Sequence, residues 1–169
     1  KDSIANAPLF LPYLSGERTP HNDPHIRGSF HSIKTTTDAT NMQYAVIEGV
    51  CFGILDGVNS ILKVNNNFEK IFMVGGGSRS AFWIQLLASL LDRKLSVCEQ
   101  SEYGASLGVA RLAMHLDKNI DDKSAIIKEI KISNEYKPKL NNIDILLKRY
   151  EIWKDLYSSN KKIAYKLLH

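Results

Sequence analysis

The apolar residues in the first half of the chain follow a helical pattern. From residue 42 to residue 61 they recur every third or fourth position, and Asp38 or Thr40 can cap the start of such a helix. Three glycines, each costing up to about 1 kcal/mol relative to alanine inside a helix, share one face: Gly49, Gly53 and Gly57. We therefore expect a helix over residues 40–62 whose glycine face closely approaches another helix or strand.

The middle of the chain alternates between strand and helix patterns. Two short apolar runs, at residues 71–74 and 95–98, predict buried strands. Helical patterns follow them at residues 78–91 and 104–115. In the second of these helices we expect four residues to face the core: Ala105, Gly108, Val109 and Leu112. The order strand, glycine-rich turn, helix, strand, helix predicts an α/β fold.

The last third of the chain predicts further helices. A short helix is expected around residues 123–132 and a longer one over residues 141–159. We interpret residues 1–116 as one α/β domain and residues 117–169 as a helical extension packed on it. The net charge of +4 lies entirely in this extension, where basic residues are interleaved with acidic ones. The pattern favours a solvated, lysine-rich helix surface, so we expect no nucleic acid as a partner.

A turn-rich segment over residues 8–28 carries four prolines and two glycines. We expect an ordered connector whose charged residues face a cleft or are satisfied locally: Glu17, Arg18, Asp23 and Arg27. The two acidic residues could act as general bases. Ion pairs with the two arginines are the interpretation that we favour.

Composition narrows the classes of protein. No run of about 18 apolar residues is present, so we expect no membrane span. The two cysteines lie in apolar stretches and fit a buried, reduced state, which agrees with a cytoplasmic protein. His21 and His25 are four residues apart, but they lie in the proline-rich segment and not on a helix. We therefore expect no metal site.

The turn over residues 75–80, here called the glycine turn, is the strongest candidate for binding chemistry. Three glycines let a backbone approach a ligand closely, and the free N–H groups of the following helix can bind polar groups. The turn lacks the GK[ST] ending of a Walker A loop and the GxGxxG pattern of a dinucleotide site. Spacing alone leaves two alternatives open, a ligand site or a plain strand-to-helix connection.

Five segments occur in a fixed order along the chain: LPYLSGERTPHNDP at 11–24, EGVCF at 48–52, GGGSRS at 75–80 followed by Trp83 and Gln85, YGASLGVARLA at 103–113, and YKP at 136–138 with aromatic residues up to 157. Together they resemble the FGGY family of carbohydrate kinases. The resemblance covers nearly the whole chain. One departure is Ser32, which stands where that family commonly has glycine, so we expect the turn leading to the long helix to differ.

The resemblance implies a ribonuclease-H-like (actin-like ATPase) domain, the C-terminal part of a two-domain sugar kinase. It implies that this domain binds most of the ATP, with Mg²⁺ carried by the nucleotide, and that three residues contact it: Gly76, Gly77 and Ser80. The first strands of the domain and the catalytic aspartate are expected to lie outside this chain. No catalytic residue is therefore expected within it.

The resemblance also implies a reaction and its partners. The substrate would be D-xylulose, and the remaining partner would be the N-terminal kinase domain. A homodimer with a second copy of the chain is left open. By itself the chain is expected to be inactive and to bind ATP weakly. Two alternatives stay open: a kinase for another pentulose or a sugar acid, and a non-catalytic, kinase-like binding module.

Overall fold

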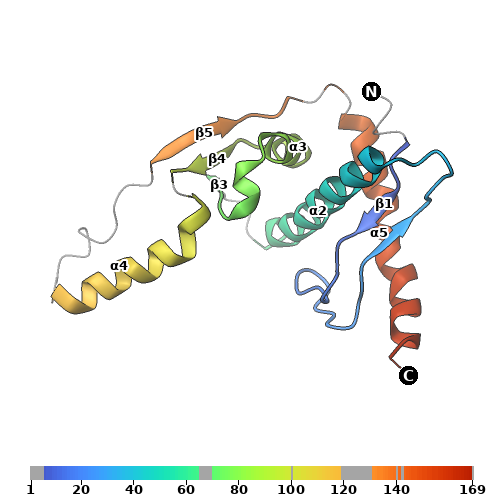
Figure 1. Ribbon diagram of the computed structural model, residues 1–169, viewed down its shortest axis with the longest axis horizontal. Helices are drawn as coiled ribbons and strands as arrows, with labels where there is room; N and C mark the ends of the chain where they lie inside the picture. Colours follow the sequence, from blue (N-terminus) through green and yellow to red (C-terminus); the bar gives the residue numbers. More distant parts are fainter. Residues whose placement is uncertain are drawn as a thin grey trace.

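The computed structural model describes residues 6–64, 70–99, 101–118, 131–139, 141 and 143–168. Within them the strands are β1 (Leu9–Leu11), β2 (Ser29–His31), β3 (Ile71–Met73), β4 (Leu95–Cys98) and β5 (Ile132–Tyr136). The helices are α2 (Ala39–Leu62), α3 (Ala81–Leu91), α4 (Gly104–Lys118) and α5 (Ile143–Lys166), with short 3₁₀ turns η1 (Gly76–Arg79) and η2 (Ser101–Tyr103). The fold is α/β, as predicted (Figure 1).

The predicted long helix is confirmed as α2. Asp38 caps it: its carboxylate accepts a hydrogen bond from the Asn41 N–H at 2.7 Å, while the Asn41 side chain accepts one from the Asp38 N–H. The expected close approach is confirmed at Gly49, where a Cβ would lie 2.2 Å from the carbonyl oxygen of Phe10. At Gly53 and Gly57 the nearest atoms lie at ordinary distances of 3.6 and 3.7 Å.

Strands β1 and β2 form an antiparallel pair that lies on α2. The sequence predicts only an ordered connector in this region. Each has three residues, too few for an alternating pattern to show. Ser32, directly after β2, has φ +63°, in the left-handed region that glycine favours. Ser32 therefore has the kind of backbone conformation that glycine adopts most easily, although its side chain is that of serine.

Strands β3, β4 and β5 form the second sheet, in that order. β3 and β4 are parallel and confirm the two predicted strands, whereas β5 is antiparallel to β4 and was not predicted. The helix expected at 123–132 is wrong at Ile132, which begins β5; residues 123–130 lie outside the described residues. The helix expected from 78 begins at Ala81, because residues 76–79 form a 3₁₀ turn and Ser80 is the N-cap.

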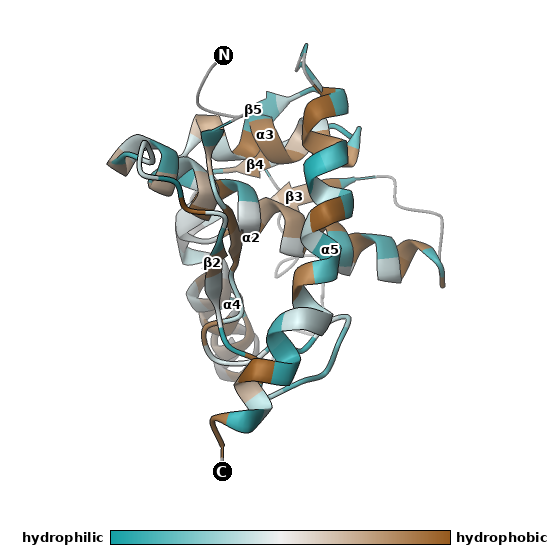
Figure 2. Cartoon of the chain, turned by 90° about the vertical axis from the view of Figure 1, so that its right-hand side faces the viewer, coloured by the Kyte–Doolittle hydropathy of each residue, from teal (hydrophilic) through white to brown (hydrophobic). Residues whose placement is uncertain are grey.

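Helix α5 lies against β1, α2 and α3, and it extends seven residues beyond the predicted end at 159. Its apolar residues join the main core: Leu146, Tyr150 and Trp153. Apolar and polar positions alternate along it (Figure 2). The Trp153 indole also donates a hydrogen bond to the Phe10 carbonyl at 2.8 Å. The last helix therefore covers the first strand of the chain.

Helix α4 departs from the prediction. Val109 and Leu112, expected to face the core, are 66% and 63% exposed, and Ala105 and Gly108 are exposed as well. Figure 1 shows α4 extending away from the two sheets. The helical periodicity was correct, but the expected burial is wrong because the described residues place nothing over its apolar face.

Helix α2 is long and apolar enough to cross a membrane by length and composition alone, the one such helix in the described part of the chain. At its middle the fully buried Glu48 carboxylate accepts two hydrogen bonds from Arg149 of α5, at 2.8 and 2.7 Å. Burial raises the pKa of Glu48, and the guanidinium opposes that shift. This pairing with another helix of the same chain is typical of a core helix.

The two cysteines are free. Cys51 is buried in α2, as predicted, and burial raises the pKa of its thiol to about 12. Cys98, at the end of β4, is only half-buried.

Candidate functional site

The glycine turn leaves the carboxyl end of β3 and leads into α3. Gly75 has φ +85°, a conformation that side chains disfavour, and its N–H donates a hydrogen bond to the Ser101 carbonyl at 2.8 Å. Ser78 returns to Gly75, because both its N–H and its hydroxyl donate to the Gly75 carbonyl, at 3.1 and 2.7 Å. The turn is thus a compact, internally bonded loop.

A second turn, η2, follows the neighbouring strand β4. Because β3 and β4 are parallel, both turns leave the same edge of the sheet. The Ser78 and Ser101 hydroxyl oxygens lie 2.6 Å apart and join the two turns. In open α/β sheets, ligands bind outside the carboxyl ends of the strands. The two turns therefore form one surface at the edge where a ligand is expected.

The structure brings the three predicted site residues together, but it gives them different surroundings. Gly76 is exposed, and a Cβ there would meet nothing within 4 Å, so its backbone is open to a ligand. At Gly77 a Cβ would lie 2.9 Å from the Trp83 ring. The Ser80 hydroxyl accepts a hydrogen bond from the Trp83 N–H at 3.3 Å as the N-cap of α3. Gly76 is thus the open position, while Gly77 and Ser80 shape the turn.

Exposed apolar side chains lie on the elements that flank the glycine turn. Val74 precedes it, Phe82 follows it on α3, and Tyr103 belongs to η2; each is more than half exposed. An open backbone beside apolar and aromatic side chains can accept a planar, partly apolar group, while the N–H groups at the start of α3 favour polar or anionic atoms.

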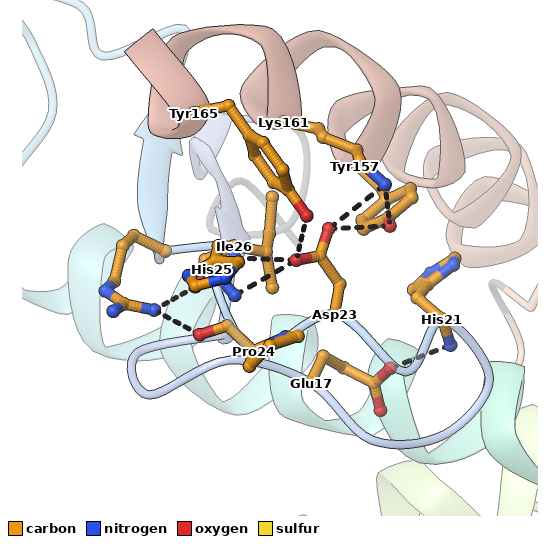
Figure 3. A network of polar contacts seen from close by, with 10 residues as sticks. Glu17, His21, Asp23, Pro24, His25, Ile26, Tyr157, Lys161 and Tyr165 are labelled. Atoms are coloured by element: carbon orange, nitrogen blue, oxygen red, sulfur yellow. Dashed lines mark hydrogen bonds and ion pairs between the residues drawn. The ribbon is translucent and has the colours of Figure 1, made fainter. Parts of the chain in front are cut away.

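The charged residues predicted in the 8–28 segment are held mainly by its own backbone and by α5. Glu17 accepts hydrogen bonds from the Thr19 and His21 N–H groups, at 2.6 and 3.0 Å. Asp23 is only 2% exposed, and Figure 3 shows its carboxylate enclosed by the loop and by α5. Its partners are the N–H groups of His25 and Ile26, the hydroxyls of Tyr157 and Tyr165, and the Lys161 ammonium at 3.3 Å.

The predicted ion pairs of Glu17 and Asp23 with the two arginines are therefore wrong. The Arg27 guanidinium donates to the carbonyls of Pro24 and Ile26, and both Arg18 and Arg27 are exposed. Burial raises the pKa of Asp23, but the hydrogen bonds from Tyr157, the His25 backbone, Tyr165 and Lys161 outweigh it, so the net pKa lies well below its usual range. Asp23 is a buried, ionised anchor for α5.

The α5 residues that hold Asp23 were missed from the sequence. Tyr157, Lys161 and Tyr165 are spaced by four, so they share one helix face. That spacing was the available signal, but it did not identify the partner 134 residues earlier in the chain.

Two of the histidines pack against α5. His21 stacks on the Tyr157 ring with 3.6 Å between centroids, and its Nε2 lies 3.5 Å from the Asp56 carboxylate. His25 meets the edge of Tyr165. Across the described ranges, no group of three or more His, Cys, Asp or Glu residues is arranged to hold a metal ion.

Comparison with known proteins gives the chain its relatives. A xylulose kinase of Staphylococcus epidermidis is 34% identical over 167 residues, which are 97% of this chain and 33% of that protein. A crystal structure of a xyloylose kinase from Brucella ovis superposes with a TM-score of 0.78 at 32% identity, covering 93% of this chain and 32% of that one. A gluconokinase of Bacillus subtilis is 29% identical over 119 residues, which are 70% of this chain and 23% of that protein.

The chain spans about one third of the length of the two xylulose kinases and 23% of the length of the gluconokinase. Its α/β structure is that of the C-terminal, actin-like ATPase domain of such kinases. Residues 1–116 match the C-terminal domain of the FGGY family of carbohydrate kinases. The division of the chain at residue 116 stays a prediction. Strand β5 lies after this boundary and joins the same sheet as β4, which lies before it. The chain belongs to the FGGY family of carbohydrate kinases.

Proposed function

We propose that the chain is the ATP-side part of a cytoplasmic kinase that transfers the γ-phosphate of MgATP to the 5-hydroxyl of D-xylulose. The observation that carries the proposal is the match with a xylulose kinase over 97% of the chain. The products are ADP and D-xylulose 5-phosphate. The proton of the hydroxyl passes to an aspartate supplied by the N-terminal domain, outside these 169 residues.

The glycine turn is the nucleotide contact in this proposal. Gly76 supplies an open backbone, and the exposed side chains of Val74 and Tyr103 offer apolar surface for the adenosine. Gly77 and Ser80 act indirectly by fixing Trp83 and the start of α3. Mg²⁺ arrives with the phosphates. In the 8–28 segment, Arg18 and Arg27 are the exposed charges that can face a cleft, while Glu17 and Asp23 hold the loop in shape.

The partner in this proposal is the N-terminal kinase domain. The surface of this chain on which that domain docks includes the apolar face of α4. Val109, Leu112 and Leu116 are more than 60% exposed there. The matched relatives have about two thirds of their length outside the region that this chain covers. A homodimer through the same face is the rival, and sedimentation of the chain with and without the N-terminal domain separates the two.

The first test is activity. The 169-residue chain alone should show no phosphorylation of D-xylulose. The complete polypeptide, meaning this chain joined to the first strands of its own domain and to the N-terminal kinase domain, should be active with ATP. Phosphorylation by the chain alone would contradict the proposal. A complete polypeptide that binds ATP but phosphorylates no sugar would favour the alternative of a non-catalytic binding module.

The second test addresses the site. In the complete polypeptide, Gly76→Leu should raise the KM for ATP by roughly tenfold or more, because the side chain fills the open position, and Gly76→Ala should raise it less. Gly57→Ala is the control, since a Cβ there lies at an ordinary distance from its neighbours. An unchanged KM for ATP in Gly76→Leu would reject the assignment.

A second candidate function is phosphorylation of a sugar acid, favoured by the similarity to the gluconokinase. Comparing kcat/KM for D-xylulose, other pentuloses and gluconate in the complete polypeptide separates the two. A higher value for gluconate would replace the first proposal.

A further inference from the structure

A pair of serines joins the glycine turn to the neighbouring turn η2. Ser78 and Ser101 are 23 residues apart in sequence, yet their hydroxyl oxygens lie 2.6 Å apart. Ser101 is buried and Ser78 is half-buried.

The direction of the hydrogen bonds follows from counting protons. The Ser78 hydroxyl has one hydrogen and donates it to the Gly75 carbonyl at 2.7 Å. The bond between the two hydroxyls must therefore use the Ser101 hydrogen, with Ser78 as acceptor. The result is a chain from the Ser101 hydroxyl through the Ser78 hydroxyl to the Gly75 carbonyl, in which each bond polarises the next.

The same two serines hold both backbone groups of Gly75. Its carbonyl accepts from Ser78, and its N–H donates to the Ser101 carbonyl at 2.8 Å. Gly75 has φ +85°, and a Cβ at Gly75 or at Gly76 would meet nothing within 4 Å. Packing around these two glycines is therefore sparse, and the hydrogen bonds are what fixes the peptide that precedes the open position.

We propose that Ser78 and Ser101 act together as positioning residues for nucleotide binding. The hydroxyl chain from Ser101 through Ser78 ends on the Gly75 carbonyl and fixes it, so that the Gly76 backbone is held in its binding position. This inference rests on the proposed function of the glycine turn. It adds Ser101, a buried residue of η2, to the site.

The experiment is a double-mutant cycle in the complete polypeptide, with Ser78→Ala, Ser101→Ala and the double variant. Each single variant should raise the KM for ATP about fivefold, the equivalent of about one hydrogen bond, and the double variant should be little worse than either. The kcat and the KM for D-xylulose should stay within about twofold. Ser78→Thr, which keeps the hydroxyl, should restore the KM for ATP.

The matched control is Ser60→Ala, because the Ser60 hydroxyl donates to the Asp56 carbonyl within α2 at 3.0 Å. Its KM for ATP should not change. Since Ser78 is only half-buried, Ser78→Ala with its threonine rescue tests the proposal even if Ser101→Ala does not fold.

Three outcomes would overturn the inference alone, and a fourth would overturn it together with the proposed function. An unchanged KM for ATP in both serine variants, with a raised KM in Gly76→Leu, removes the positioning role and leaves the proposed function intact. Additive effects in the double variant show that the serines act separately. A parallel loss of thermal stability and of affinity for both substrates shows a purely structural role. If Gly76→Leu has no effect either, both proposals fail together.

Discussion

Helices α4 and α5 are both amphipathic, yet only α5 is covered by the rest of the described chain. On α5, Trp153 is 1% exposed, and its partners come from β1 and α2, about 100 residues or more earlier. On α4, Leu112 is 63% exposed. The comparison teaches that periodicity identifies which face of a helix is apolar, but not whether the covering surface belongs to the same chain.

Replacing Trp153 of α5 with alanine should cause the largest loss in the free energy of unfolding. The lost packing costs about 3–5 kcal/mol, and the Phe10 carbonyl also loses its donor. Urea unfolding of the chain measures the effect. Leu112→Ala on α4 is the matched control and should change the free energy of unfolding by less than about 0.5 kcal/mol. Equal losses in both variants would show that α4 is covered as well.

Replacing Arg149 with methionine should cost about 3 kcal/mol, because Glu48 is left buried without its partner. Burial already raises the pKa of Glu48, so the unpaired carboxyl favours the protonated form. The stabilisation that comes from the protonated Glu48 carboxyl is present at low pH and is lost as the pH rises through the raised pKa of Glu48. The cost should therefore shrink when urea unfolding is repeated at lower pH, and adding Glu48→Met should recover most of it. A cost independent of pH would contradict this explanation.

Asp23→Asn should cost about 2 kcal/mol at neutral pH, since the charged carboxylate accepts hydrogen bonds from the loop and from α5. The folded pKa of Asp23 is lowered, so the stabilisation is present above the unfolded value of 3.8 and is lost as the pH falls below it. Unfolding of the wild type between pH 5 and pH 2 should show that loss, and Asp23→Asn should show less of it. Asp144→Asn, at an exposed position, is the control.

The smallest effect on stability is expected on the exposed apolar face of α4. Leu112→Ser with Leu116→Ser should leave the unfolding of the 169-residue chain within about 0.5 kcal/mol of wild type. The same variant should bind a separately expressed N-terminal kinase domain at least about tenfold more weakly in calorimetry. Unchanged binding would remove α4 from the docking surface.

Elements with a strong local pattern were predicted well. Apolar residues close together in sequence predict α2, β3 and β4. Strands β1 and β2 have only three residues each and β5 is largely exposed and polar, so none of the three has a recognisable apolar pattern. At the site, the glycine turn was predictable from its composition. The contact of Gly77 with the Trp83 ring and the link from Ser78 to Ser101 depend on how the turns fold back, so spacing in the sequence does not reveal them.

The contact between the two ends of the chain also has a consequence for synthesis. Arg149 and Trp153 bind the carbonyls of Ala7, Pro8 and Phe10, more than 140 residues earlier. Strand β1 therefore leaves the ribosome long before the helix that covers it. Folding of this region must wait until Trp153 has been synthesised, and until then the apolar residues of β1 lack the helix that covers them.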